Sequence, residues 1–136
     1  MSITSYLTFD GNCREAMTFY QACLGGQLHF QTLGDSPMAE KMPAQMKGAI
    51  LHATLSKEDM LIMASDIVSE KGLQRGNAVS LMLHCKSEGE IKELYKSLSN
   101  GGQETHPPEL SFWGALFGDL IDKYGNQWLL YFPLKS

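Results

Sequence analysis

The chain has 136 residues, of which 43% are hydrophobic and 19% are charged, and its formal net charge is −4. These values fit one globular domain with a buried core, and the acidic balance argues against nucleic acid or an anionic membrane as a partner. No apolar run approaches the roughly 20 residues of a membrane span, and no signal peptide opens the chain, so we expect a cytoplasmic protein.

Three cysteines, Cys13, Cys23 and Cys85, are odd in number and widely spaced. Disulfide frameworks and metal centres use paired or closely spaced cysteines, so this set fits neither. We expect three reduced thiols.

The first expected strand covers residues 3–9, where polar and apolar side chains alternate. Asp10-Gly11 then turns the chain, and Asn12 followed by Glu15 has the spacing of a capping box. An apolar stripe at i, i+3, i+4 and i+7 predicts an amphipathic helix that ends at a glycine pair. The stripe is Ala16, Phe19, Tyr20 and Cys23, and the pair is Gly25-Gly26.

The second half repeats this order. Residues 79–85 alternate, and Ser87 with Glu90 forms a second capping box. The same helical stripe and glycine pair follow, as Ile91, Leu94, Tyr95 and Leu98, then Gly101-Gly102. Two such runs in the same order predict a duplicated unit.

Further strands complete each half. In the first half they are expected at residues 27–33, 49–55 and 60–64. In the second half Pro107-Pro108 degrades the strand after the helix, because proline cannot sit in a central ladder. A hairpin follows, with arms at residues 113–122 and 127–132 and a turn at residues 123–126. Asp122 is expected to be a turn residue.

The whole chain, residues 1–136, is therefore expected to be one domain built from units 1–66 and 78–136. The polar, glycine-containing stretch 67–77 reads as their linker, and Asp66 as its start. Residues 35–48 form a longer excursion that carries Met38, Met42 and Met46. We expect it to cover the core with adaptable side chains, and a substrate-adaptive lid is the alternative.

Three groups of residues resemble one known family. They are the opening Tyr6 to Ala16 with Phe19-Tyr20, the strand end Leu61 to Asp66, and the terminal motifs Phe112-Trp113-Gly114, Phe117-Gly118, Asp122 to Gly125 and Trp128. They resemble the PhnB-like branch of the vicinal oxygen chelate superfamily, which includes glyoxalase I, bleomycin-resistance proteins and extradiol dioxygenases. The resemblance covers nearly the whole chain. It implies an α+β fold of two βαβββ units that form an open mixed sheet around a cleft, with helices outside and a homodimer.

The resemblance also implies where a metal would bind. Metal-dependent members place ligands on the first and last strands of each unit, usually His, Gln or Glu. Here Met63 ends the fourth strand, and Leu129 stands where such relatives carry Glu. Neither side chain offers the oxygen or nitrogen donors that a divalent ion needs, so we expect no metal and no cofactor.

The resemblance and the strand alternation together predict a cleft for a small-molecule ligand. Its lining is expected to be Tyr6, Thr8, His52, Ser80, Met82, His84, Trp113, Phe117 and Trp128. His52 and His84 lie opposite apolar neighbours on their strands, so both should face the cleft, where they would be able to deprotonate a substrate without metal. His29 and His106 are expected at the surface.

The leading hypothesis is a protein that binds a small organic molecule without metal. The alternative is a divalent-metal-dependent lyase, isomerase or dioxygenase with atypical ligands such as His52 and His84. A third possibility is a dimeric scaffold with no ligand. The sequence lacks a nucleophile elbow and an adenosylmethionine-binding glycine-rich loop, which argues against nucleophilic catalysis and against a Rossmann-type methyltransferase.

Overall fold

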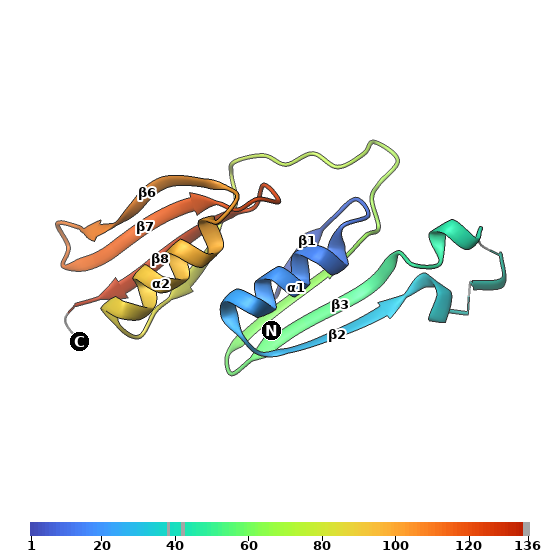
Figure 1. The fold of residues 1–136 in the computed structure, drawn as a ribbon, viewed down its shortest axis with the longest axis horizontal. Coiled ribbons are helices and arrows are strands. Elements are labelled where there is room, and N and C mark those ends of the chain that lie inside the picture. The colour runs from blue at the N-terminus through green and yellow to red at the C-terminus, as the bar shows by residue number, and fades with distance from the viewer. Residues whose placement is uncertain (38, 42, 135–136) are drawn as a thin grey trace. The chain divides into compact units, whose positions relative to one another are not determined.

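The computed structural model describes residues 1–37, 39–41 and 43–134. Its chain divides into two units, Met1–Gln74 and Arg75–Ser136. Each unit has the order strand, helix and three strands, and in each the helix lies across one face of a four-stranded sheet (Figure 1). The predicted α+β class and the duplicated βαβββ plan are confirmed. No helix in the described part of the chain is long and apolar enough to cross a membrane.

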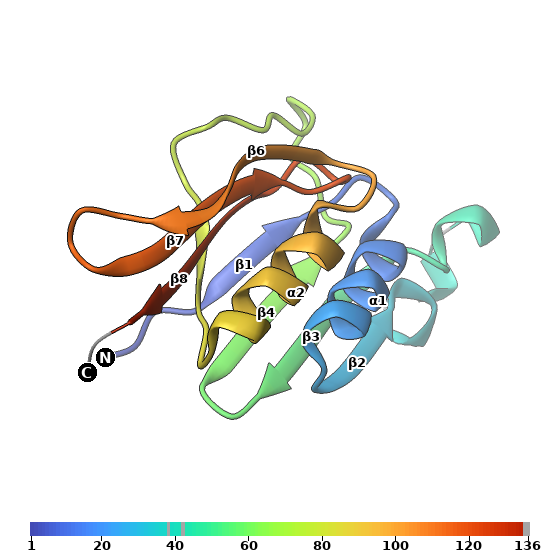
Figure 2. The ribbon, with the colours of Figure 1, turned by 60° about the vertical axis from the view of Figure 1, so that its left-hand side comes forward.

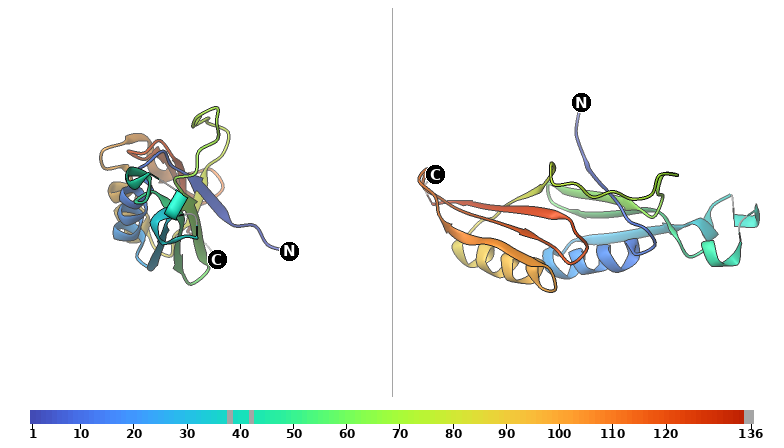
Figure 3. Two further views of the ribbon diagram at one scale, coloured as in Figure 1. Left: turned by 90° about the vertical axis from the view of Figure 1, so that its right-hand side faces the viewer. Right: turned by 90° about the horizontal axis from the view of Figure 1, so that it is seen from above.

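The first unit forms a mixed sheet in the order β1-β4-β3-β2, with α1 on one face (Figure 2). Its elements are β1 (Ser5–Thr8), α1 (Cys13–Leu24), β2 (Gln27–Thr32), β3 (Ile50–Lys57) and β4 (Met60–Ser65). β1 runs parallel to β4, and the other pairs are antiparallel. The excursion forms three short 3₁₀ helices, η1 (Leu33–Asp35), η2 (Ala39–Lys41) and η3 (Ala44–Met46), beyond the ends of β2 and β3 (Figure 3). Met46 is exposed, while Met38 and Met42 lie outside the described residues.

The second unit repeats this plan in the order β5-β8-β7-β6, with α2 on one face. Its elements are β5 (Leu81–His84), α2 (Glu88–Ser99), β6 (Gln103–Leu110), β7 (Ala115–Ile121) and β8 (Gln127–Pro133). β5 runs parallel to β8, and the other pairs are antiparallel. The predicted hairpin is therefore β7 and β8, and its turn contains Gly125 at a φ of 90°.

Each core lies between a helix and its sheet. The largest buried side chains of the first unit are Phe9, Met17, Tyr20, Ile50 and Leu55. Those of the second unit are Ile91, Leu98, Leu120, Trp128 and Leu130. Burying one large apolar side chain contributes about 1.5–3 kcal/mol, so each set stabilises its unit by roughly 10 kcal/mol before the entropy cost of folding.

The two helices begin differently. Ser87 caps α2 as predicted, because its Oγ accepts a 3.0 Å hydrogen bond from the backbone N of Glu90. The first capping box is wrong, since the Asn12 side chain makes no capping hydrogen bond. Asp66, at the end of β4, takes that place: its Oδ1 accepts 3.0 Å hydrogen bonds from the backbone N of Gly11 and of Cys13. A carboxylate near a helix N-terminus is also favoured by the helix dipole.

Pro107-Pro108 lie inside β6, an eight-residue strand rather than a degraded one. β6 is an edge strand, where the missing N–H groups of proline leave no neighbour unpaired, and its register with β7 shifts on both sides of His106. Gly118 of β7 allows the backbone of β6 to lie close to β7, because glycine has no Cβ atom. A Cβ atom there would lie 2.9 Å from both the His106 carbonyl oxygen and the Pro108 nitrogen.

Candidate functional site

The face of the second sheet opposite α2, here called its open face, carries two rows of side chains. Trp128 and Leu130 are buried beneath α2, so the side chains that alternate with them on β8 lie on the open face. The strand register then shows which residues lie side by side on this face, and each row takes one residue from β6, β7, β8 and β5 in that order. The first row is His106, Asp119, Leu129 and Met82, and the second is Glu109, Phe117, Tyr131 and His84.

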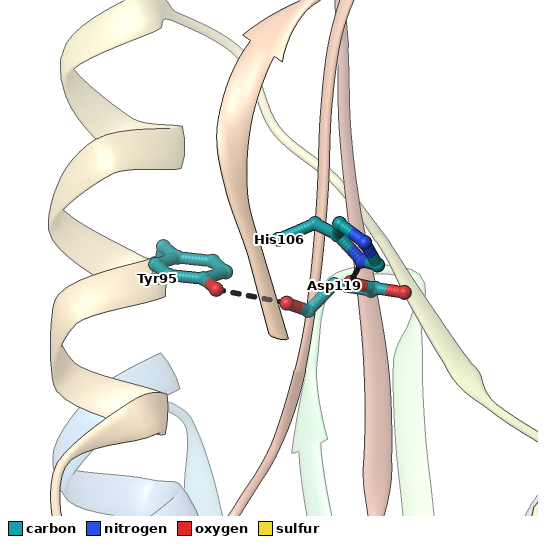
Figure 4. Close-up of polar contacts among 3 residues, drawn as sticks. All are labelled: Tyr95, His106 and Asp119. Atoms are coloured by element: carbon teal, nitrogen blue, oxygen red, sulfur yellow. Dashed lines mark hydrogen bonds and ion pairs between the residues drawn. The ribbon is translucent and has the colours of Figure 1, made fainter. Parts of the chain in front are cut away.

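The first row contains a histidine–aspartate pair. Nδ1 of His106 lies 2.7 Å from Oδ1 of Asp119, and the two side chains are 72% and 33% exposed. From the opposite side of the sheet, the Tyr95 hydroxyl of α2 donates a 2.8 Å hydrogen bond to the backbone carbonyl of Asp119 (Figure 4). Asp119 is thus held through its backbone by α2, while its carboxylate holds the imidazole.

Tyr95 is suited to this holding role. Burial, helped by the negative charges of Glu104 and Asp119, raises the pKa of Tyr95 to about 12. The phenol therefore keeps its proton at neutral pH, and its hydrogen bond to the Asp119 carbonyl persists across the physiological range.

A pocket of about 280 Å³ opens beside this pair. Its lining comprises His106, Glu109, Leu110, Ser111, Trp113, Phe117 and Asp119. The Trp113 and Phe117 rings meet edge to face at 5.8 Å and form its aromatic wall. Aromatic pairs of this geometry are worth about 0.5–1.5 kcal/mol beyond the area they bury, so they help to hold the wall in place.

The turn that presents Trp113 is fixed by hydrogen bonds. The Ser111 Oγ donates to the Ala115 carbonyl at 2.8 Å and accepts from the Ala115 backbone N at 3.2 Å. Gly114 adopts a φ of 84°, which side chains with a Cβ rarely tolerate. The indole is therefore presented by an ordered turn.

The structure brings together several of the residues predicted for the second half. Trp113 and Phe117 line the pocket, while Met82 and His84 share the open face, with the His84 ring 5.5 Å from the Tyr131 ring. Ser80 precedes β5 and is exposed.

Trp128 has a different environment, and its predicted place in the cleft is corrected here. It is only 1% exposed, and its Nε1 donates to Oδ2 of Asp122 at 2.8 Å. This leaves it no surface to offer a ligand.

The other predicted residues, Tyr6, Thr8 and His52, share the open face of the first sheet. There the row equivalent to that of His106 reads His29, Thr54, Met63 and Tyr6 from β2 through β3 and β4 to β1. The duplication therefore places a histidine on both edge strands. The partner on the next strand is Asp119 in the second unit and Thr54 in the first.

The centre of each open face lacks a metal-ligating side chain at one of two corresponding positions. Met63 and Leu129 occupy corresponding central positions on the two open faces, and both are apolar. Over the described ranges, no three His, Cys, Asp or Glu side chains gather closely enough to hold an ion. A protein site for such an ion needs several converging donors.

The sequence reasoning did not identify His106, Asp119 and Glu109 as pocket residues. One signal was present, since Asp119 lies two residues after Phe117 on the same face of a strand. The register that brings His106 opposite Asp119 depends on irregular pairing around two prolines, which no local pattern reveals.

Comparison with known proteins decides the family. The model of the family described as 3-demethylubiquinone-9 3-methyltransferase matches residues 1–131. The chain belongs to this family. Protein YjdN of Escherichia coli (strain K12) is 30% identical over 143 residues, which cover 96% of this chain and 94% of that protein.

Solved structures agree with this assignment. Protein PA1353 from Pseudomonas aeruginosa has 35% identity and a TM-score of 0.86, and 98% of each chain is covered. The PhnB protein from Bacillus cereus has 27% identity and a TM-score of 0.76, with 97% of this chain and 99% of that chain covered. A glyoxalase/bleomycin resistance protein/dioxygenase family enzyme from Burkholderia phytofirmans PsJN shares the fold, with 14% identity, a TM-score of 0.66 and 96% and 98% covered. The predicted PhnB-like branch is confirmed, and the weaker likeness confirms the glyoxalase/bleomycin resistance fold.

Proposed function

We propose that this protein binds a small organic molecule with an aromatic ring in the pocket of its second unit, without a metal ion. One observation carries the proposal: the edge-to-face pair of Trp113 and Phe117 forms an apolar wall directly beside the polar pair of His106 and Asp119. Small-molecule sites typically combine such aromatic walls with a few placed polar groups.

The size of the pocket limits the ligand. Typical ligand sites have volumes of about 300–1,000 Å³, and this pocket of about 280 Å³ lies at the lower end. A compound with one ring fits this volume better than an extended cofactor. Trp113 is 53% exposed, so part of its indole surface is accessible to such a ring.

The family description names a methyltransferase, but the topology of this chain does not favour that chemistry. A Rossmann-type cofactor site needs a glycine-rich loop between parallel strands of a doubly wound sheet. Each sheet here has a single parallel pair, β1 with β4 or β5 with β8, and the remaining pairs are antiparallel. We therefore assign the aromatic pocket a binding role and propose no methyl transfer.

Titration calorimetry with a panel of one-ring aromatic compounds tests the proposal. Trp113→Ala should weaken binding of any hit by about tenfold or more, because it removes half of the aromatic wall. Tyr6→Ala is the matched control, since Tyr6 is an aromatic residue of equal exposure, 53%, on the first unit. Binding that survives Trp113→Ala but is lost in Tyr6→Ala would place the ligand elsewhere.

A separate experiment tests whether ligand binding depends on a metal ion. Each titration is repeated after treatment with a chelator, and unchanged affinity supports the proposal. If binding disappears and returns with a divalent transition metal, the metal-dependent alternative replaces it.

A further inference from the structure

The orientation of the His106 ring is set by its partner. A carboxylate can only accept hydrogen bonds, so the ring nitrogen 2.7 Å from Asp119 Oδ1 must carry a hydrogen. That nitrogen is Nδ1. In the neutral imidazole the other nitrogen, Nε2, then bears the lone pair and acts as an acceptor. Because Nδ1 is engaged, Nε2 is the nitrogen that remains for a ligand in the pocket.

The charges of the pocket exclude one class of ligand. Its lining includes the carboxyl groups of Glu109 and Asp119 but no lysine or arginine. A carboxylate or phosphate would meet repulsion here and would lack the cationic partner that anion sites supply. The Ser111 hydroxyl already donates to the Ala115 carbonyl. The pocket therefore offers mainly acceptors to the polar end of a ligand, namely Nε2 of His106 and the carboxylates of Glu109 and Asp119, so that end must donate a hydrogen bond.

We propose that the ligand is a phenol-class compound whose ring packs on Trp113 and Phe117 and whose hydroxyl donates to Nε2 of His106. This inference rests on the proposed function and names its ligand class. The hydrogen stays on the ligand oxygen, because a phenolate would meet the same repulsion from Glu109 and Asp119. His106 therefore acts as a hydrogen-bond acceptor toward the ligand, with its ring held by Asp119.

The duplicated fold supplies an internal control. His29 occupies the place on β2 that His106 occupies on β6, but its partner on the next strand is Thr54 instead of an aspartate. Both histidines are exposed on edge strands. His29→Gln therefore changes the same residue type in the same strand position, without touching the pocket of the second unit.

Phenol and anisole form the matched ligand pair, since a methyl group on the ring oxygen of anisole replaces the hydrogen that phenol can donate. The wild-type protein and His29→Gln should bind phenol about tenfold more tightly than anisole, because one hydrogen bond to a pocket nitrogen is gained. His106→Phe should bind both compounds equally, since it keeps an aromatic side chain and removes the acceptor. A preference for phenol that survives His106→Phe would overturn the inference.

A spectroscopic readout separates this inference from the proposed function. Long-range proton–nitrogen spectra of the imidazoles, recorded at a pH where the His106 ring is neutral, should show its hydrogen on Nδ1, and Asp119→Ala should lose this fixed tautomer. A hydrogen on Nε2 in the wild-type protein would overturn the inference. If phenol and anisole bind equally and the binding of both depends on Trp113, the proposed binding pocket is supported. The inference that the ligand donates a hydrogen bond to His106 is then wrong. If neither compound binds, both the proposed function and the proposed ligand class are wrong.

Discussion

The indole Nε1 of Trp128 donates a hydrogen bond to a buried carboxylate, Oδ2 of Asp122, at 2.8 Å. The other oxygen of Asp122 accepts from the backbone N of Tyr124 and of Asn126, at 2.8 and 3.0 Å. Asp122 is 2% exposed, so this carboxylate is the polar centre of the turn between β7 and β8. The turn residue expected from the sequence thus also fixes the largest side chain of the core.

Asp122→Ala should lower the free energy of unfolding by about 3–5 kcal/mol, because it leaves three donors without this acceptor in a buried setting. Denaturant titration measures the loss. Asp59→Ala, at an exposed acidic position, is the control and should stay within about 0.5 kcal/mol of the wild type. A loss as small as that of the control would show that the turn holds without the carboxylate.

Asp66→Ala should cost about 1–3 kcal/mol, since it removes the acceptor that caps α1 from the end of β4 and also binds the Ile50 backbone N at 2.8 Å. Asn12→Ala should cost little, because the Asn12 side chain makes no capping hydrogen bond. Chemical denaturation of the two variants gives the comparison. A larger loss of stability in Asn12→Ala than in Asp66→Ala would support the Asn12 capping box that the sequence predicts.

Gly118→Ala should destabilise the protein by about 1–3 kcal/mol, although alanine is the better strand residue, because its Cβ would press against His106 and Pro108 of β6. The shift of β6 should also lengthen the His106–Asp119 contact and release the imidazole tautomer in nitrogen spectra. Gly76→Ala is the control, since nothing lies within 4 Å of a Cβ built there. Unchanged stability and an unchanged tautomer in Gly118→Ala would mean that β6 adapts without cost.

The thiols should react in a defined order. Burial raises the pKa of Cys13 to about 12 and that of Cys85 to about 11, so neither forms the reactive thiolate near neutral pH. Cys23 is partly exposed and should be labelled first by a disulfide-exchange reagent in the native protein. Equal rates for all three would show that the buried thiols open to solvent readily.

The same shifts predict a loss of stability at alkaline pH. Between about pH 9 and 12 the thiols of the unfolded chain ionise first, so the unfolded state binds fewer protons than the folded state. The free energy of unfolding should therefore fall as pH rises through this window, and Cys13→Ala should reduce the slope. Stability that does not fall between pH 9 and 12 would contradict the burial of these groups.

Much of the fold was predictable, because its signals are local. Strand alternation and the glycine pairs each act within a few residues and appear in both halves, and the Ser87 cap acts over three residues in the second half. The Asp66 cap was not predictable, since its partner Cys13 lies far away in sequence and Asn12 offered a nearer candidate. Pro107-Pro108 read as a broken strand because the sequence does not show that β6 lies at an edge.

The candidate site was predictable only in part. Trp113 and Phe117 were expected at a ligand site because small-molecule pockets combine aromatic faces with a few polar groups. Trp128 was misplaced because β8 carries large apolar side chains on both faces, so alternation does not tell which face meets α2. The pairing of His106 with Asp119 depends on a register that only the folded sheet defines.

Titration of the protein with phenol, followed by proton–nitrogen spectra in the presence of a chelator, tests the central claim most directly. The chain has two tryptophans, so its spectrum contains two indole N–H signals, one from exposed Trp113 and one from buried Trp128. We predict that the Trp113 signal shifts in a saturable way while the Trp128 signal stays in place. Saturable shifts confined to the first unit, or no shift at all until a metal is added, would contradict the claim.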